Sequence, residues 1–217
     1  MPIRKIDFAP GEYYHLYNRG VRKQAIFRDP ADRARFIYIL LECQFEEALN
    51  NVSRNSKKLL KEKKLILKEK IGQRKKLIAL HFFILMDNHY HLSVQEIVDT
   101  GISTYMQKVM TSYAKYFNLK YKESGHLFEG PFQAIHVKTN NQLLHLSAYI
   151  HKNCSNIKGW KGREENYFWS SYWDHVRENR WGSYLDTTPI LEQFATPKEY
   201  ETFVTETEIK EKDREPD

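Results

Sequence analysis

The sequence predicts an α+β protein, a ferredoxin-like βαββαβ sandwich with an added C-terminal helix and a basic helical insertion. Short aromatic and apolar segments alternate with longer stretches in which apolar residues recur at helical spacing. Turn-forming Asp, Asn, Gly and Pro residues separate these segments. The 217 residues are 41% apolar and 14% aromatic, which is enough to form the core of one domain and excludes wholesale disorder.

The first half of the chain contains three predicted strands and one helix. Residues 13–17 predict a strand that runs into the turn Asn18-Arg19-Gly20. A helix is predicted from Asp29-Pro30, because Asp29 can cap its start, Pro30 suits the first turn, and apolar residues follow at helical spacing. Residues 77–86 and 89–94 predict two strands of a hairpin joined at Asp87-Asn88.

The second half completes the predicted sandwich. Residues 100–120 predict a helix with one apolar face, and residues 131–137 predict a fourth strand after a loop bracketed by Gly125 and Gly130. A final helix is predicted over residues 141–153, with Asn140 as its cap.

We therefore expect residues 1–160 to form the main domain, with a basic arm over about 50–76. Residues 161–204, which include the aromatic cluster 167–173, are expected to pack on it as a C-terminal extension. Residues 205–217 hold six acidic and three basic side chains and are expected to form a loose acidic tail.

Two further features bear on the compartment. No apolar run approaches the ~20 residues of a membrane span, and no secretory signal is visible. The two cysteines, Cys43 and Cys154, cannot build a disulfide framework. A reducing cytoplasm is the expected compartment.

Positive charge is concentrated in one segment. Residues 51–76 contain 11 basic and 2 acidic side chains, which leaves 23 basic and 26 acidic elsewhere. A local cationic strip of this kind suits a polyanion, most often nucleic acid. A solvated helical arm explains the charge run equally well.

The triplet His89-Tyr90-His91 is the sharpest local motif. Alternate residues of a strand point to the same face, so both imidazoles project together and form half of a site for a divalent metal. On spacing alone the motif is weak, because short His-x-His strings occur by chance.

A second constellation lies on the final predicted helix. His145, Tyr149 and Asn153 are spaced at i, i+4 and i+8, which places them on one polar stripe. One interpretation is that this polar stripe forms part of a functional site. The alternative is that Tyr149 rims the core and Asn153 ends the helix as a C-cap.

Six short sequence blocks occur in order between residues 13 and 172. They are Tyr14-His15-Leu16-Tyr17-Asn18-Arg19-Gly20, Phe83-Ile84-Leu85-Met86-Asp87-Asn88-His89-Tyr90-His91-Leu92, Tyr116-Phe117-Asn118, Gly125-His126-Leu127-Phe128-Glu129-Gly130, Ala148-Tyr149-Ile150-His151-Lys152-Asn153 and Trp169-Ser170-Ser171-Tyr172. Together they resemble the single-tyrosine HUH transposases, and within them the REP-associated tyrosine transposases. The chain departs from that pattern at Cys154, where the family usually has proline.

The resemblance implies a site and a reaction. His89 and His91 would hold Mg²⁺ or Mn²⁺ with Asn153 as third protein ligand, and Tyr149 would be the nucleophile that nicks and joins single-stranded DNA at a hairpin through a 5′-phosphotyrosine. Tyr113 and Tyr116 are the rival nucleophiles. The expected location is cytoplasmic and nucleoid-associated, and a monomer is favoured over a dimer.

Basic side chains are the candidates for DNA contacts. They are Arg19, Lys57, Lys58, Lys61, Lys63, Lys64, Arg74, Lys75 and Lys76. The remaining histidines, His15, His81, His126, His136, His151 and His175, are assigned to packing or to the surface. Two alternative functions stay open: a domesticated protein of the same fold that binds hairpin DNA without cutting it, and a small structural metal protein that never meets DNA.

Overall fold

The structure is a computed structural model that describes residues 6–47, 52–62 and 74–209. Its centre is one antiparallel sheet with the strand order β2-β3-β1-β4. The strands are β1 (Tyr13–Arg19), β2 (Ile78–Leu85), β3 (His89–Glu96) and β4 (Gln133–Val137). The predicted α+β class is confirmed.

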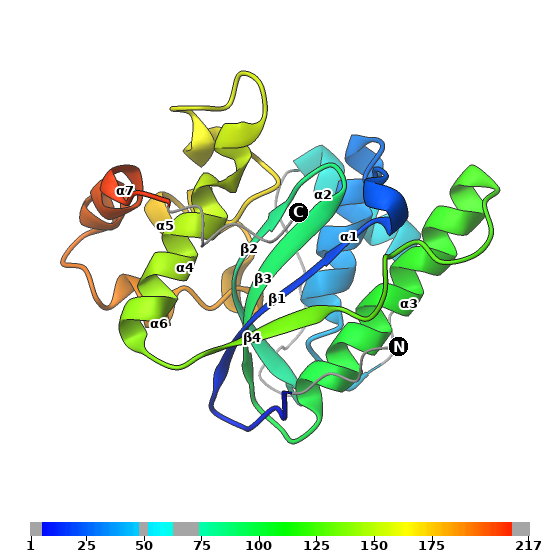
Figure 1. The fold of residues 1–217 in the computed structure, drawn as a ribbon, viewed down its shortest axis with the longest axis horizontal. Helices are drawn as coiled ribbons and strands as arrows, with labels where there is room; N and C mark the ends of the chain where they lie inside the picture. The colour runs from blue at the N-terminus through cyan, green and yellow to red at the C-terminus, as the bar shows by residue number, and fades with distance from the viewer. Residues whose placement is uncertain (1–5, 48–51, 63–73, 210–217) are drawn as a thin grey trace.

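Helices cover both faces of the sheet (Figure 1). On one face lie α1 (Pro30–Glu42) and α3 (Gly101–Tyr121), with α2 (Val52–Glu62) packed against α1. On the other lie α4 (Asn140–Lys152), α5 (Tyr172–Val176), α6 (Thr188–Leu191) and α7 (Pro197–Glu206). Each face of the sheet carries a hydrophobic core, because successive side chains of a strand point to opposite faces. Tyr90 and Leu92 face α1 and α3, whereas Phe82 and Ile84 face α4.

Turn and cap chemistry sets the element boundaries. Asp29 caps α1 as predicted: its side chain accepts from the backbone N–H of Asp32, and the Asp32 side chain accepts in return. The Asp87-Asn88 turn joins β2 to β3, so the predicted hairpin is confirmed.

The predicted cap of α4 is wrong by one residue. The helix is capped by Thr139, whose extended backbone lets its hydroxyl accept from the Gln142 N–H at 3.2 Å. Asn140 is the first helical residue, and its side-chain amide pairs with that of Gln193 instead.

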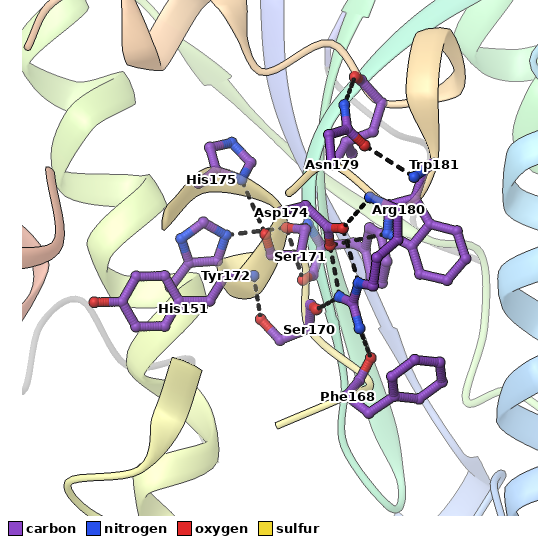
Figure 2. A network of polar contacts seen from close by, with 12 residues as sticks. His151, Phe168, Ser170, Ser171, Tyr172, Asp174, His175, Asn179, Arg180 and Trp181 are labelled. Carbon is purple, nitrogen blue, oxygen red and sulfur yellow. Dashed lines mark hydrogen bonds and ion pairs between the residues drawn. The ribbon is translucent and has the colours of Figure 1, made fainter. Parts of the chain in front are cut away.

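A buried polar network holds the C-terminal residues against β2 and α4 (Figure 2). The Ser171 hydroxyl accepts from the backbone N–H of Phe83 on β2 at 2.9 Å. The imidazole of His151 on α4 bonds the same hydroxyl through Nε2 at 3.0 Å and the Tyr200 hydroxyl on α7 through Nδ1 at 2.7 Å. One histidine therefore joins α4 to the segment beside β2 and to α7.

An ion pair anchors the other end of this network. The carboxylate of Asp174 is fully buried and accepts from Arg180 at 2.6 Å and from the indole N–H of Trp181 at 2.9 Å. The Arg180 guanidinium also donates to the backbone carbonyl of Ser170 at 2.9 Å. The buried charge is thus both neutralised and hydrogen-bonded, as a buried ion pair requires.

Two predicted segments fall partly outside the described residues. The basic helix predicted over 57–70 is described to Glu62 as part of α2, and residues 63–73 lie outside. Of the predicted acidic tail, Thr205 and Glu206 belong to α7, and residues 210–217 lie outside. Within the described residues, no helix is long and apolar enough to cross a membrane.

Candidate functional site

Strand β3 places His89 and His91 on the sheet face that α4 covers. Their ring centroids are 5.2 Å apart and the rings are perpendicular. The β1–β3 register sets Arg19 opposite His89 and Tyr17 opposite His91, and the Tyr17 ring stacks on His91 with centroids 6.0 Å apart. The two imidazoles therefore lie side by side, as the strand periodicity predicts.

Helix α4 brings Tyr149 and Asn153 to the same place. The Tyr149 ring is 8% exposed and lies 5.5 Å from the His91 ring, edge-on to it. One turn later Asn153 ends the helix as its C-cap, and its side chain hydrogen-bonds the imidazole of His89. The structure thus brings together all four residues to which the resemblance gives a role.

The third member of the predicted polar stripe lies elsewhere. His145 is exposed, two turns before Asn153, and its ring packs near Phe203 of α7 with centroids 6.0 Å apart. The predicted stripe therefore divides: the His145 ring lies beside α7, whereas Tyr149 and Asn153 lie beside the histidine pair.

Burial keeps both imidazoles of the motif neutral. Desolvation lowers the pKa of His91 well below its ordinary value, and the neighbouring His15 and His89 lower it further. Desolvation also lowers the pKa of His89, assisted by the charge of Arg19 and opposed by the Asn153 hydrogen bond and Asp87. A neutral imidazole is the form that can bind a metal ion.

The contacts of His89 fit a metal ligand. Its Nδ1 lies 2.6 Å from Oδ1 of Asn88, whose side-chain amide donates to the Lys23 carbonyl at 3.0 Å. Asn88 therefore presents its oxygen and accepts the Nδ1–H of His89. In the neutral ring the lone pair is then on Nε2, the nitrogen on the side of Asn153, where a metal could bind.

The donor set limits the kind of metal that could bind. Among the described residues, no group of three or more His, Cys, Asp and Glu side chains could hold an ion. Two imidazoles and the amide of Asn153 leave positions open for water and substrate oxygens, which suits Mg²⁺ or Mn²⁺ better than a closed structural zinc site.

Sequence reasoning missed His15. Its Nε2 lies 2.9 Å from Nδ1 of His91, its side chain is 5% exposed, and burial lowers its pKa to about 3. Strand alternation puts His15 on the same sheet face as Tyr17, but only the β1–β3 register shows that this face meets His91.

The rival tyrosines lie on the other side of the sheet. On α3, the Tyr113 hydroxyl donates to the Ile26 carbonyl at 2.6 Å, and the Tyr116 hydroxyl donates to Asp32 at 2.9 Å. Both side chains belong to the packing of α3 and not to the histidine pair.

The candidate DNA contacts differ in their surroundings. Arg19 lies next to the site and forms an ion pair with Glu129 at 2.8 Å. Lys57, Lys58 and Lys61 are exposed on α2, whereas Lys63 and Lys64 lie outside the described residues. The remaining three have intramolecular partners: Arg74 pairs with Glu42 and Glu47, Lys75 pairs with Glu46, and Lys76 donates to the Ser183 carbonyl.

A cavity of about 850 Å³ adjoins the site. It lies between the end of β1, one face of α3 and the loop at residues 125–131, and its lining includes Tyr17, Arg19 and Met110. Tyr17 is common to both, because it lines the cavity and its ring stacks on His91.

Comparison with known proteins gives a family match and a structural match. Residues 48–153 match the family model described as "Transposase IS200 like". The fold matches the structure of a REP-associated tyrosine transposase bound to a REP hairpin, with a TM-score of 0.54 and 11% sequence identity over 87% of this chain and 94% of the other. No curated protein matches the chain. The resemblance indicated by the sequence motifs is thereby confirmed.

Proposed function

We propose that this protein is a metal-dependent strand transferase that nicks and rejoins single-stranded DNA beside a hairpin. The observation that carries the proposal is the convergence of Tyr149 and Asn153 on the pair His89 and His91. The family match and the hairpin held by the structural neighbour support DNA as the substrate.

His89, His91 and Asn153 would hold the divalent cation. When bound, the cation would neutralise charge on the scissile phosphate and so let an oxygen nucleophile approach. The hydroxyl oxygen of Tyr149 attacks phosphorus and loses its proton to solvent. The bond from phosphorus to the 3′ oxygen breaks, and that oxygen takes a proton from solvent. The products are a 5′-phosphotyrosyl protein and a free 3′-hydroxyl, and the reverse reaction rejoins a strand.

The DNA would reach the site from the side of β1. Arg19 lies opposite His89 and can meet a phosphate next to the scissile one. The cavity whose wall is Tyr17 can receive an unstacked base of the single-stranded flank. The exposed lysines of α2 would contact phosphates of the hairpin stem.

We expect a monomer. The tyrosine helix α4 packs against α7 of its own chain and is joined to it through His151 and Tyr200. A dimer that exchanges α4 between copies would have to break this contact. Light scattering after gel filtration measures the mass directly.

The second candidate is a protein of the same fold that binds hairpin DNA without cutting it. Incubation with end-labelled single-stranded hairpin DNA and Mn²⁺, followed by denaturing electrophoresis, separates the two. A covalent adduct that disappears with a chelator supports the strand transferase. Tight binding with no adduct for any hairpin tested would favour the binding protein.

A further inference from the structure

His15 and His91 share one hydrogen bond inside the sheet face. Nε2 of His15 lies 2.9 Å from Nδ1 of His91, and the two rings are nearly stacked, with centroids 5.2 Å apart and planes at 21°. In the β1–β3 register His15 pairs with Ser93, so His91 is its diagonal neighbour on the same face. Both side chains are buried.

Only one hydrogen fits between these two nitrogens when both rings are neutral. If the hydrogen is on His15, then Nδ1 of His91 accepts, and the N–H of His91 must be on Nε2. That nitrogen then has no lone pair for a metal. If the hydrogen is on Nδ1 of His91, its Nε2 carries the lone pair that coordination of a metal requires.

We propose that His15 is a positioning residue that accepts the Nδ1–H of His91 and so holds His91 in the tautomer and orientation a metal ligand needs. Asn88 plays the same part for His89, by accepting its Nδ1–H at 2.6 Å. The two ligands are thus oriented by partners on different elements: Asn88 in the β2–β3 turn and His15 on β1. Partners of this kind orient metal-binding histidines in many proteins.

This assignment rests on the proposed metal site, and a simpler role for His15 must be separated from it. Its ring also packs 5.1 Å from Tyr17 and 6.3 Å from Tyr149, so it could serve only as an aromatic filler. His15→Phe keeps a ring and removes the acceptor. His15→Gln loses the ring, but its side-chain carbonyl oxygen can accept from His91.

The first measurement is the tautomer of His91 in the metal-free protein, from ¹⁵N chemical shifts assigned with a His91 variant. We expect the hydrogen on Nδ1 in the wild type and in His15→Gln, and a mixture of tautomers in His15→Phe. A wild-type His91 with its hydrogen on Nε2 would overturn the proposal.

The second measurement is Mn²⁺ affinity, by titration calorimetry or electron paramagnetic resonance. We expect His15→Phe to bind Mn²⁺ about 10- to 100-fold more weakly and His15→Gln to stay within a few-fold of the wild type. Hairpin DNA binding and the thermal midpoint serve as checks of the fold. Wild-type affinity in His15→Phe, or equal loss in both variants, would leave His15 as a filler.

Failure of the proposed function gives a different result. A wild-type protein that binds no Mn²⁺ at His89 and His91 would contradict the metal chemistry itself. The tautomer measurement would still decide the role of His15, because it needs no metal.

Discussion

The Tyr149 ring meets the His91 imidazole edge-on, with centroids 5.5 Å apart and planes at 87°. His91 belongs to β3, a central strand of the sheet, whereas Tyr149 belongs to α4 and lies 58 residues further along the chain. The geometry between the proposed nucleophile and the proposed metal ligand is therefore set by how α4 packs on the sheet.

Tyr149→Phe should abolish the covalent DNA adduct and the cleavage, because it removes only the hydroxyl oxygen. Hairpin affinity should stay within a few-fold of the wild type, and so should the metal affinity. Denaturing gels with labelled DNA and Mn²⁺ measure the adduct. Tyr116→Phe makes the same chemical change on α3 and should keep the adduct, with a loss of about 1 kcal/mol of stability from its bond to Asp32. DNA-linked peptides that contain Tyr113 or Tyr116 would show that the nucleophile is misassigned.

His89→Ala and His91→Ala should each abolish cleavage while hairpin binding survives within a few-fold. Phosphate contacts supply most of the affinity for DNA, whereas these two side chains would hold the metal ion that cleavage needs. Parallel assays of cleavage and filter binding check this. The matched control is His145→Ala, since His145 is exposed on α4 and should be dispensable for both. If binding and cleavage fall together in the two motif variants, the histidines are structural.

Arg19→Gln should weaken hairpin binding and reduce the slope of log K against log salt by about one unit. The reason is that Arg19 faces the site and would share its charge between Glu129 and a DNA phosphate. Arg177→Gln is a suitable control, because Arg177 forms a comparable surface pair with Glu201 in the C-terminal segment. Identical salt slopes for Arg19→Gln and the wild type would remove Arg19 from the DNA interface.

Replacement of Lys57, Lys58 and Lys61 by Gln together should lower the salt slope by up to about three units if α2 contacts phosphates. These side chains are exposed and lie on one short helix, so the fold should persist. The control removes three other exposed charges, Lys158, Lys161 and Lys198. If both triple variants change the slope equally, α2 is a solvated arm and not a DNA contact.

His175 should make the fold less stable in mild acid. Burial lowers its pKa to about 4, and the carbonyl of Ser171, which accepts from its Nδ1–H, and the charge of Asp186 only partly oppose the effect, while His81 adds to it. Below pH ~6.5, the ordinary pKa of histidine, the unfolded chain binds a proton at His175, whereas the folded chain does not. The stability of the fold with neutral His175 is therefore fully present above pH 6.5 and is lost as the pH falls toward 4.

The loss from His175 alone should be about 2 kcal/mol between pH 6.5 and pH 5. Urea unfolding of the wild type and of His175→Gln at several pH values measures it. Because other histidines, including the neighbouring His151, are also buried, the relevant quantity is the difference between the two pH profiles. Parallel profiles would mean that His175 is protonated in the folded protein.

The sequence predicted those features that depend on local chemistry. The Asp29 cap follows from a side chain that bonds its own backbone neighbours. The Asp87-Asn88 turn follows from two residue types that favour turns. The cap of α4 could not be chosen in the same way, because Thr139 and Asn140 are adjacent and both can cap; backbone conformation decides in favour of Thr139.

Contacts between elements were harder to predict. Strand alternation placed His89 and His91 on one face, but the partner of His91 depends on the pairing of β1 with β3. Helical spacing grouped His145 with Tyr149, yet the His145 ring lies beside Phe203 of α7, a contact between elements that no spacing rule contains.

The hydrogen bonds of His151 have a consequence for anyone who trims or grafts this protein. The family match stops at residue 153, so a fragment cut there would retain every side chain proposed to react. It would lose Ser171 and Tyr200, whose hydroxyls hydrogen-bond the two ring nitrogens of His151 and so hold α4 in place. The segment that the family model covers is therefore shorter than the segment that holds α4 in place. A transplant of the proposed catalytic groups should include the chain to the end of α7.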